Sequence, residues 1–222
     1  MTAPGSQHVV AKRCSLLRRR HDVTVAAFRD HWAGPHATIA RAMPGIARYT
    51  QNRIAERLWA RHDVAPAFEC DGIVELEFRD EQAMAEANAG EAVRHLLPED
   101  ELRFLGGITL CAVPVGSQQT WLGMVKVMLA ARLLDGIPVA GVHDMLEASG
   151  CVEHSLDPVF AMFHRQRLGH ETQPPHLFAT LWFDPRHDVG ASFAARSPWA
   201  RASAACIGRG TVWRCDPLAI IG

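Results

Sequence analysis

The 222-residue chain has almost no net charge, no long hydrophobic run and only one tyrosine. Lysine and arginine total 23 against 24 aspartates and glutamates, which gives a formal charge of −1 at pH 7. This balance argues against a nucleic-acid or acidic-lipid surface as the main function. Apolar runs such as residues 124–131 are far shorter than the ~20 residues that a membrane-spanning helix needs. We therefore expect a globular protein with no nucleic-acid partner and no membrane partner.

Sequence signals for disulfides, metals and phosphates are also missing. The six cysteines have long, irregular gaps and form no C-x-x-C pair, and the polar segment 1–7 lacks the apolar core of a secretion signal. We therefore expect free thiols and a cytoplasmic location. The 12 histidines show no H-E-x-x-H spacing, no glycine-rich loop leads into a helix, and no G-x-S-x-G elbow occurs. Neither a metal nor another cofactor is predicted.

The first half of the chain predicts the order β-α-β-β-α-β. Four segments have the apolar or alternating pattern of strands: 9–17, 46–54, 71–78 and 107–115. Helical spacing occurs at 25–43 and 80–90, with a short acidic helical turn at 99–104, and Gly34-Pro35 is expected to interrupt the first helix. The charged segment 56–68 is expected to be a connection. This order defines a split βαβ, or ferredoxin-like, unit.

The second half repeats the same order after a polar linker at 116–120. Its strand-like segments are 122–133, 159–167, 175–183 and 210–215, and its helical segments are 139–149 and 189–206. We therefore expect an α+β protein of two ferredoxin-like units, residues 9–115 and 120–219. Each unit would carry helices on one sheet face, so the two sheets would pack face to face as an intrachain dimeric α/β-barrel. The chain would then be a monomeric pseudo-dimer or form a homodimer.

His36, Tyr49 and Asp71 are the first candidates for catalysis. His36 follows Pro35 at the predicted helix break, where a neutral imidazole can move a proton near neutral pH. Tyr49, on the second strand, can donate a hydrogen bond to a substrate carbonyl or enolate. Asp71 can orient His36 or bind a substrate hydroxyl, although Asp-Gly also suits a plain turn. His31 is a further candidate, but five residues are the wrong step to share one α-helical face with His36.

Side chains around this group are expected to form a mostly apolar pocket in the first half. The candidates lie on the first helix and the third strand: Phe28, Trp32, Ile39 and Phe78. Asn52 is a further substrate-binding candidate, but it lies three residues after Tyr49 and faces the other side of the strand unless the strand bulges. In the second half, a polar cluster is interpreted as a solvated hairpin: His164, Arg165, Arg167, His170 and His176.

The segment from Phe28 to Asn52 resembles a known family motif. Phe28, His31-Trp32 and His36 fit F-x-x-H/Y-W-x-x-x-H, and Pro44-Gly45, Tyr49 and Asn52 fit P-G-x-x-x-Y-x-x-N. Together with Asp71-Gly72, and with Asp100-Glu101 before Phe104, these motifs are similar to those of the EthD family of dimeric α/β-barrel proteins. The resemblance covers roughly residues 12–113, and the second half resembles the family in element order only, as a diverged copy would.

The resemblance implies a fold shared with cofactor-free lyases, cyclases, isomerases and monooxygenases of small or aromatic oxygenated compounds. In a muconolactone-isomerising relative, the catalytic histidine stands at the position matched by His36. We therefore expect a cofactor-independent lyase or dehydratase, cyclase or isomerase. Its small-molecule substrate would be an oxygenated cyclic or polyketide-like compound, and His36 would transfer the proton. The alternatives are a cofactor-free monooxygenase of the same fold and a non-catalytic protein that binds an aromatic ligand or haem.

Overall fold

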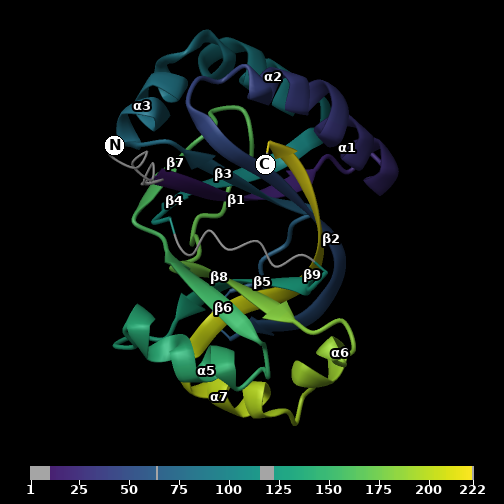
Figure 1. Ribbon diagram of the computed structural model, residues 1–222, viewed down its shortest axis with the longest axis vertical. Coiled ribbons are helices and arrows are strands. Elements are labelled where there is room, and N and C mark those ends of the chain that lie inside the picture. Colours follow the sequence, from purple (N-terminus) through teal and green to yellow (C-terminus); the bar gives the residue numbers. More distant parts are fainter. Residues whose placement is uncertain (1–10, 64, 116–122, 222) are drawn as a thin grey trace, which may run out of the picture.

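The computed structural model describes residues 11–63, 65–115 and 123–221. The strands of the first half are β1 (Ala11–Arg19), β2 (Ile46–His62), β3 (Gly72–Phe78) and β4 (Leu105–Val113). Its helical segments are α1 (Val25–His31), the π-helical turn η1 (Trp32–His36), α2 (Ala37–Arg41), α3 (Glu81–Ala89), the π-helical turn η2 (Ala92–Leu96) and α4 (Leu97–Phe104). Figure 1 shows α1, α2 and α3 gathered at one end of the molecule.

The second half has the same alternation of strands and helices. Its strands are β5 (Val125–Leu133), β6 (Glu153–Pro158), β7 (Ala161–Phe163), β8 (Leu177–Phe183) and β9 (Ile207–Ile221). Its helical segments are the 3₁₀ turn η3 (Val139–Val142), α5 (His143–Glu147), α6 (Val189–Ser192) and α7 (Pro198–Cys206). Figure 1 places α5, α6 and α7 at the end opposite α1–α3. Within the described ranges, no helix is long and apolar enough to cross a membrane.

The strands form one nine-stranded sheet in the order β6-β8-β5-β9-β2-β3-β1-β4-β7. Each half contributes the strand order of a ferredoxin-like unit, β2-β3-β1-β4 in the first and β6-β8-β5-β9 in the second. The halves are joined where β2 pairs with β9 and where β7 pairs with β4. Strands β6 and β7 lie at the two edges of this order but follow each other directly in the chain. The sheet therefore curls until its two edges meet, which makes it a barrel. The predicted fold class is confirmed.

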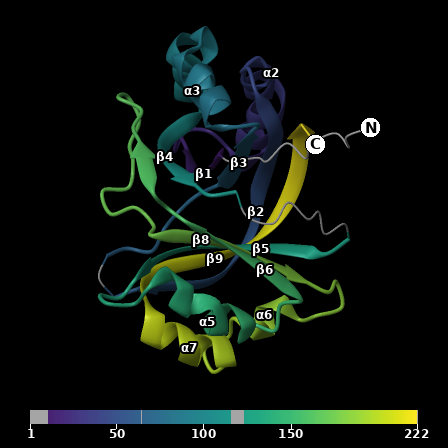
Figure 2. The same ribbon diagram turned by 60° about the vertical axis from the view of Figure 1, so that its left-hand side comes forward.

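The interior of the barrel is an apolar core that both halves share. Side chains on the inner faces of the two halves meet there: Cys14, Leu16, Ile73, Cys111 and Val113 with Met128, Ala130, Phe178, Trp213 and Cys215. The outer faces pack against the helices of their own half, as Figure 2 shows from the side. Side chains alternate along a strand, so Leu16 lies inside the barrel while Leu17 faces the helices. The inner faces therefore oppose each other as expected, but within one hydrogen-bonded sheet rather than as two separate layers.

Three predicted elements differ from the structure, the first two because of contacts distant in sequence. Strand β2 continues to His62 through the expected connection, because residues 49–62 pair with β9. The strand expected at 159–167 is replaced by β6 and β7, with Val159 hydrogen-bonded to His176 and Phe160 to Ala112 at the corner between them. The first helix is not interrupted at Gly34-Pro35. The expected linker at 116–120 lies outside the described residues, and the unit limits 9–115 and 120–219 stay a prediction.

Candidate functional site

The first helix passes through Pro35 by widening into a π turn. Proline has no backbone N–H and would leave a gap in α-helical hydrogen bonding, and η1 accommodates it without a break. In an α-helix, side chains five residues apart point about 140° away from each other. In a π turn, the i→i+5 hydrogen bond places such residues one turn apart. His31 and His36 therefore share a face, and the prediction that they would not was wrong.

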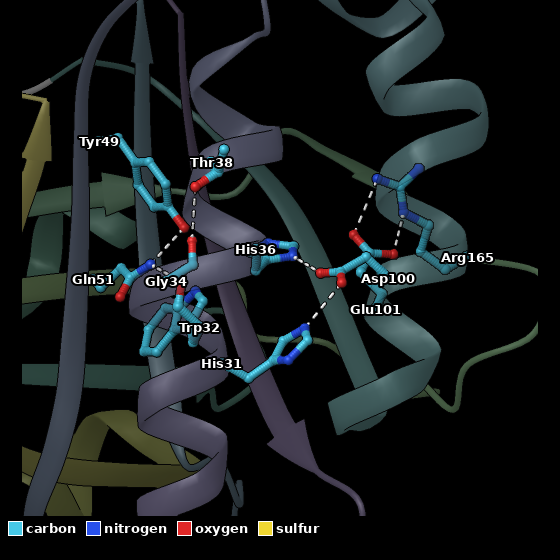
Figure 3. A network of polar contacts seen from close by, with 10 residues as sticks. All are labelled: His31, Trp32, Gly34, His36, Thr38, Tyr49, Gln51, Asp100, Glu101 and Arg165. Atoms are coloured by element: carbon cyan, nitrogen blue, oxygen red, sulfur yellow. Dashed lines mark hydrogen bonds and ion pairs between the residues drawn. The ribbon is translucent and has the colours of Figure 1, made fainter.

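Asp100, on α4, joins these two histidines. Its Oδ2 lies 2.9 Å from His36 Nδ1 and its Oδ1 lies 2.9 Å from His31 Nε2 (Figure 3). The residue is 4% exposed. Burial favours the neutral acid, but the hydrogen bonds from His36 and then His31 outweigh it and hold the pKa of Asp100 below its usual range. An ionised carboxylate only accepts hydrogen bonds, so His36 Nδ1 carries the hydrogen and Nε2 is the basic nitrogen.

His36 borders a cavity of about 40 Å³ between the helices and the outer face of the first-half sheet. Most of the lining is aliphatic, together with the ring of Trp32. Its polar members are Arg13, Ser15, His36, Tyr49, Glu101 and Arg165. His36 and Tyr49 thus line one cavity, as expected from the sequence, and His36 is 9% exposed.

Tyr49 is held by a hydrogen-bond chain on the side of the cavity opposite Asp100 (Figure 3). Gln51 Nε2 donates to the Tyr49 hydroxyl at 2.8 Å and to the Trp32 carbonyl at 2.7 Å. Burial raises the pKa of Tyr49 well above its usual value, although the hydrogen bonds act in the other direction. The hydroxyl therefore stays protonated at neutral pH. Because it accepts from Gln51, its own hydrogen remains for another acceptor.

The second half also reaches this site. Arg165, in the segment that follows β7, lies with its Nε 2.9 Å from Glu101 Oε2 and donates from Nη1 to the Val93 carbonyl at 3.3 Å (Figure 3). Its side chain is 17% exposed, so the interpretation of this residue as part of a solvated hairpin was wrong. Arg167 does fit that interpretation, because its side chain is 63% exposed.

Two predicted site residues lie elsewhere. The Asp71 carboxylate accepts hydrogen bonds from Arg19, from the backbone N at 2.9 Å and from Nε at 3.0 Å. Its expected convergence with His36 is therefore wrong, and Asp100 holds the position that Asp71 was expected to take. Asn52 faces the barrel interior, where its Nδ2 donates to Glu75 Oε2 at 2.8 Å. Strand alternation predicted that Asn52 and Tyr49 lie on different faces of β2, and the structure agrees.

Of the four residues expected to form the apolar wall, only Trp32 lines the cavity. Phe28 packs behind it, with its ring centre 5.4 Å from that of Trp32, and Ile39 packs against the edge of the same core. Phe78 is fully buried and lies under the Arg13 guanidinium. Gly72 is required by Trp32, because a Cβ at Gly72 would lie 2.4 Å from Trp32 Cζ3.

Sequence reasoning missed several polar residues of the site. All of them contact His36 or Tyr49 or line the same cavity: Arg13, Gln51, Asp100, Glu101 and Arg165. For Asp100-Glu101 a signal existed, because this pair was part of the family resemblance. For Arg165 there was none, since its partner Glu101 lies 64 positions away along the chain.

Residues 20–107 match the family model of the EthD domain. The resemblance of the first half to the EthD family is confirmed. Similar solved structures include an anthrone oxidase-like protein with 10% identity and a TM-score of 0.59, covering 97% of this chain and 95% of that one. A proposed monooxygenase from Lactobacillus acidophilus NCFM has 9% identity and a TM-score of 0.50, covering 95% and 94%. Another from Fusobacterium nucleatum has 9% identity and a TM-score of 0.53, covering 95% and 93%.

At these identities the solved structures show the shared fold alone, and no curated protein matches the sequence. The EthD match includes both histidines, Tyr49 and Asp100. Arg13 and Arg165 lie outside the matched range, so the cavity combines EthD-domain residues with two arginines from the rest of the chain.

Proposed function

We propose that the chain is a cofactor-independent enzyme that transfers a proton on a small oxygenated ring compound, with His36 as the base. The observation that carries this proposal is the Asp100–His36 hydrogen bond at the wall of an enclosed, mostly apolar cavity. A carboxylate bound to Nδ1 fixes the imidazole tautomer and stabilises the imidazolium that forms when Nε2 takes a proton.

The proposed reaction begins at a carbon next to a carbonyl group. His36 Nε2 takes the proton, and the C–H electron pair moves to the carbonyl oxygen to give an enolate. The protonated Tyr49 hydroxyl donates to that oxygen. In an isomerase, His36 returns the proton to another carbon. In a cyclase, the enolate carbon forms a bond to a second carbonyl carbon of the substrate, and His36 gives the proton to the oxygen of that carbonyl. In a dehydratase, it gives the proton to a departing hydroxyl group, which leaves as water. A cavity of about 40 Å³ is smaller than a ring compound, so binding requires part of the wall to move.

Hydrogen–deuterium exchange tests the first step without knowledge of the whole reaction. The full chain is incubated in D₂O with a panel of ring ketones and lactones, anthrone among them, and loss of the proton next to the carbonyl is followed by NMR. A positioned acid–base group supplies roughly 10²- to 10⁴-fold, so His36→Gln should lose exchange by about that factor. The matched control is His95→Gln, since His95 is exposed. Equal exchange by wild type and His36→Gln would contradict the proposal.

A cofactor-free monooxygenase is the second candidate, favoured by the names of the fold neighbours, which include an anthrone oxidase-like protein and proposed monooxygenases. The same enolate would then react with dioxygen instead of regaining a proton. An oxygen electrode separates the two with any substrate that shows exchange. Oxygen consumption dependent on His36 supports the monooxygenase, and exchange without oxygen consumption supports the lyase or isomerase.

A further inference from the structure

Arg13 is a buried cation that forms no direct ion pair with another described residue. It lies on the face of β1 that is directed at the helices, is 6% exposed and lines the same cavity as His36. Its guanidinium stands over the rings of Phe78 and Phe163, at 5.4 and 5.5 Å from their centres. Within the described ranges it forms no ion pair or hydrogen bond, and its Nε is buried without a partner. Burial, and then the nearby charge of Arg165, lower the pKa of Arg13 to about 10 although the Glu101 carboxylate acts in the other direction, so Arg13 is still a cation at neutral pH.

Other buried cations of this chain are neutralised. Lys12 Nζ lies 2.8 Å from Asp157 Oδ2 and 2.9 Å from Glu75 Oε1. Arg209 Nη2 lies 2.9 Å from Glu171 Oε2, and the same guanidinium donates to the backbone carbonyls of Pro66 and Gln173. An unpaired buried charge is strongly unfavourable. Such a charge at a cavity wall indicates a group that binds its counter-ion from outside the chain.

One further hydrogen-bond donor points to the same conclusion. Ser15 follows Arg13 by two residues on β1 and therefore shares its face; it is fully buried, and its Oγ has no partner. Arg13 Nε and Ser15 Oγ thus border one cavity as donors without acceptors. The Glu101 carboxylate also lines this cavity, but Arg165 already binds it.

We propose that Arg13 binds a carboxylate of the substrate, with Ser15 as the second donor. This proposal rests on the proposed function and narrows its substrate class to enolisable ring compounds that carry a carboxylate. The cavity of about 40 Å³ exceeds the roughly 10–15 Å³ that one water needs, which leaves room for a group of carboxylate size. The Glu101 carboxylate is already bound by Arg165 and holds this second guanidinium at the rim.

The test compares benzoate with its neutral analogue benzamide by isothermal titration of the full chain, with sodium chloride and inorganic phosphate as further probes. A charge-assisted pair should make benzoate bind at least about tenfold more tightly than benzamide. Arg13→Met should abolish this difference. Arg13→Lys keeps the positive charge but lacks the paired N–H groups of the guanidinium, so it should retain part of the difference. Arg167→Met is the matched control, since that arginine is exposed, and should bind benzoate as wild type does.

His36→Gln separates the two proposals, because it should lose exchange activity and keep the preference for benzoate. If His36→Gln kept both the exchange activity and the preference for benzoate, the proposed base would be overturned and the carboxylate site would be unaffected. Equal binding of benzoate and benzamide by wild type, or full benzoate binding by Arg13→Met and Arg13→Lys, would overturn the carboxylate site. Phosphate or chloride binding that equals benzoate binding and depends equally on Arg13 would also overturn it, in favour of an inorganic anion.

Discussion

Asp100→Asn tests how the two histidines are held. The substitution keeps the shape of the side chain and removes the charge that accepts from His36 and His31, at 2.9 Å each. Hydrogen bonds to a charged group contribute about 1.5–3 kcal/mol each, and neutral ones about half as much. The variant should therefore lose about 1–3 kcal/mol of unfolding free energy. For a chain of this length, each kcal/mol corresponds to roughly 2–4 °C in the unfolding midpoint.

The pH dependence gives a second readout of the same contact. The pKa of Asp100 is lower in the folded protein than in the unfolded chain, so its contribution is complete above the unfolded value of about 3.9 and is lost as pH falls through the folded value. The difference in thermal midpoint between wild type and Asp100→Asn should thus be largest near neutral pH and shrink below about pH 4.

Exchange activity should fall about 10²- to 10⁴-fold in Asp100→Asn, because an amide no longer selects the tautomer that leaves Nε2 basic. Asp22→Asn is the matched control, since Asp22 pairs with Arg20 in an exposed position and should change neither the midpoint nor the activity appreciably. Wild-type exchange in Asp100→Asn, or a midpoint equal to wild type at neutral pH, would refute the role of Asp100.

Three further substitutions probe the same cavity. Arg13→Met should raise the thermal midpoint by up to about 10 °C, because lowering the pKa of Arg13 to about 10 corresponds to a penalty of about 3 kcal/mol on the charged form; a lower midpoint would contradict this. Arg165→Met should destabilise by about 3–5 kcal/mol in chemical denaturation, since it leaves Glu101 buried without its partner, and a loss below 1 kcal/mol would count against a buried pair. Tyr49→Phe should slow exchange roughly 10²-fold or more while benzoate binding persists, and unchanged exchange would remove Tyr49 from the mechanism.

The order of strands and helices was predictable because it depends on local alternation and helical spacing. The continuation of β2 to His62 was not, because only its pairing with β9 makes those polar residues a strand. The π turn was also hidden, since Gly34-Pro35 indicates a break unless packing on both sides keeps the helix continuous.

For the site, the sequence predicted His36 and Tyr49 in one cavity but named the wrong carboxylate. Asp71 and Asp100 are both acidic residues beside apolar segments, and the choice between them depends on which helix packs against which. Asp71 stands at the end of β1, beside Arg19, whereas α4 brings Asp100 to His36 across 64 positions of sequence. Arg13 could be placed on a strand, but not on the face that borders the cavity.

Chemical rescue tests the central claim, that His36 is the base, most directly. His36→Ala removes the imidazole and leaves space at the cavity wall, while Asp100 remains to orient a replacement. With any substrate that the wild type exchanges, His36→Ala should be about 10²- to 10⁴-fold slower. Added imidazole should restore exchange in proportion to its concentration, and the same imidazole should leave Asp100→Asn unrestored. Wild-type exchange by His36→Ala in the absence of imidazole would contradict the account.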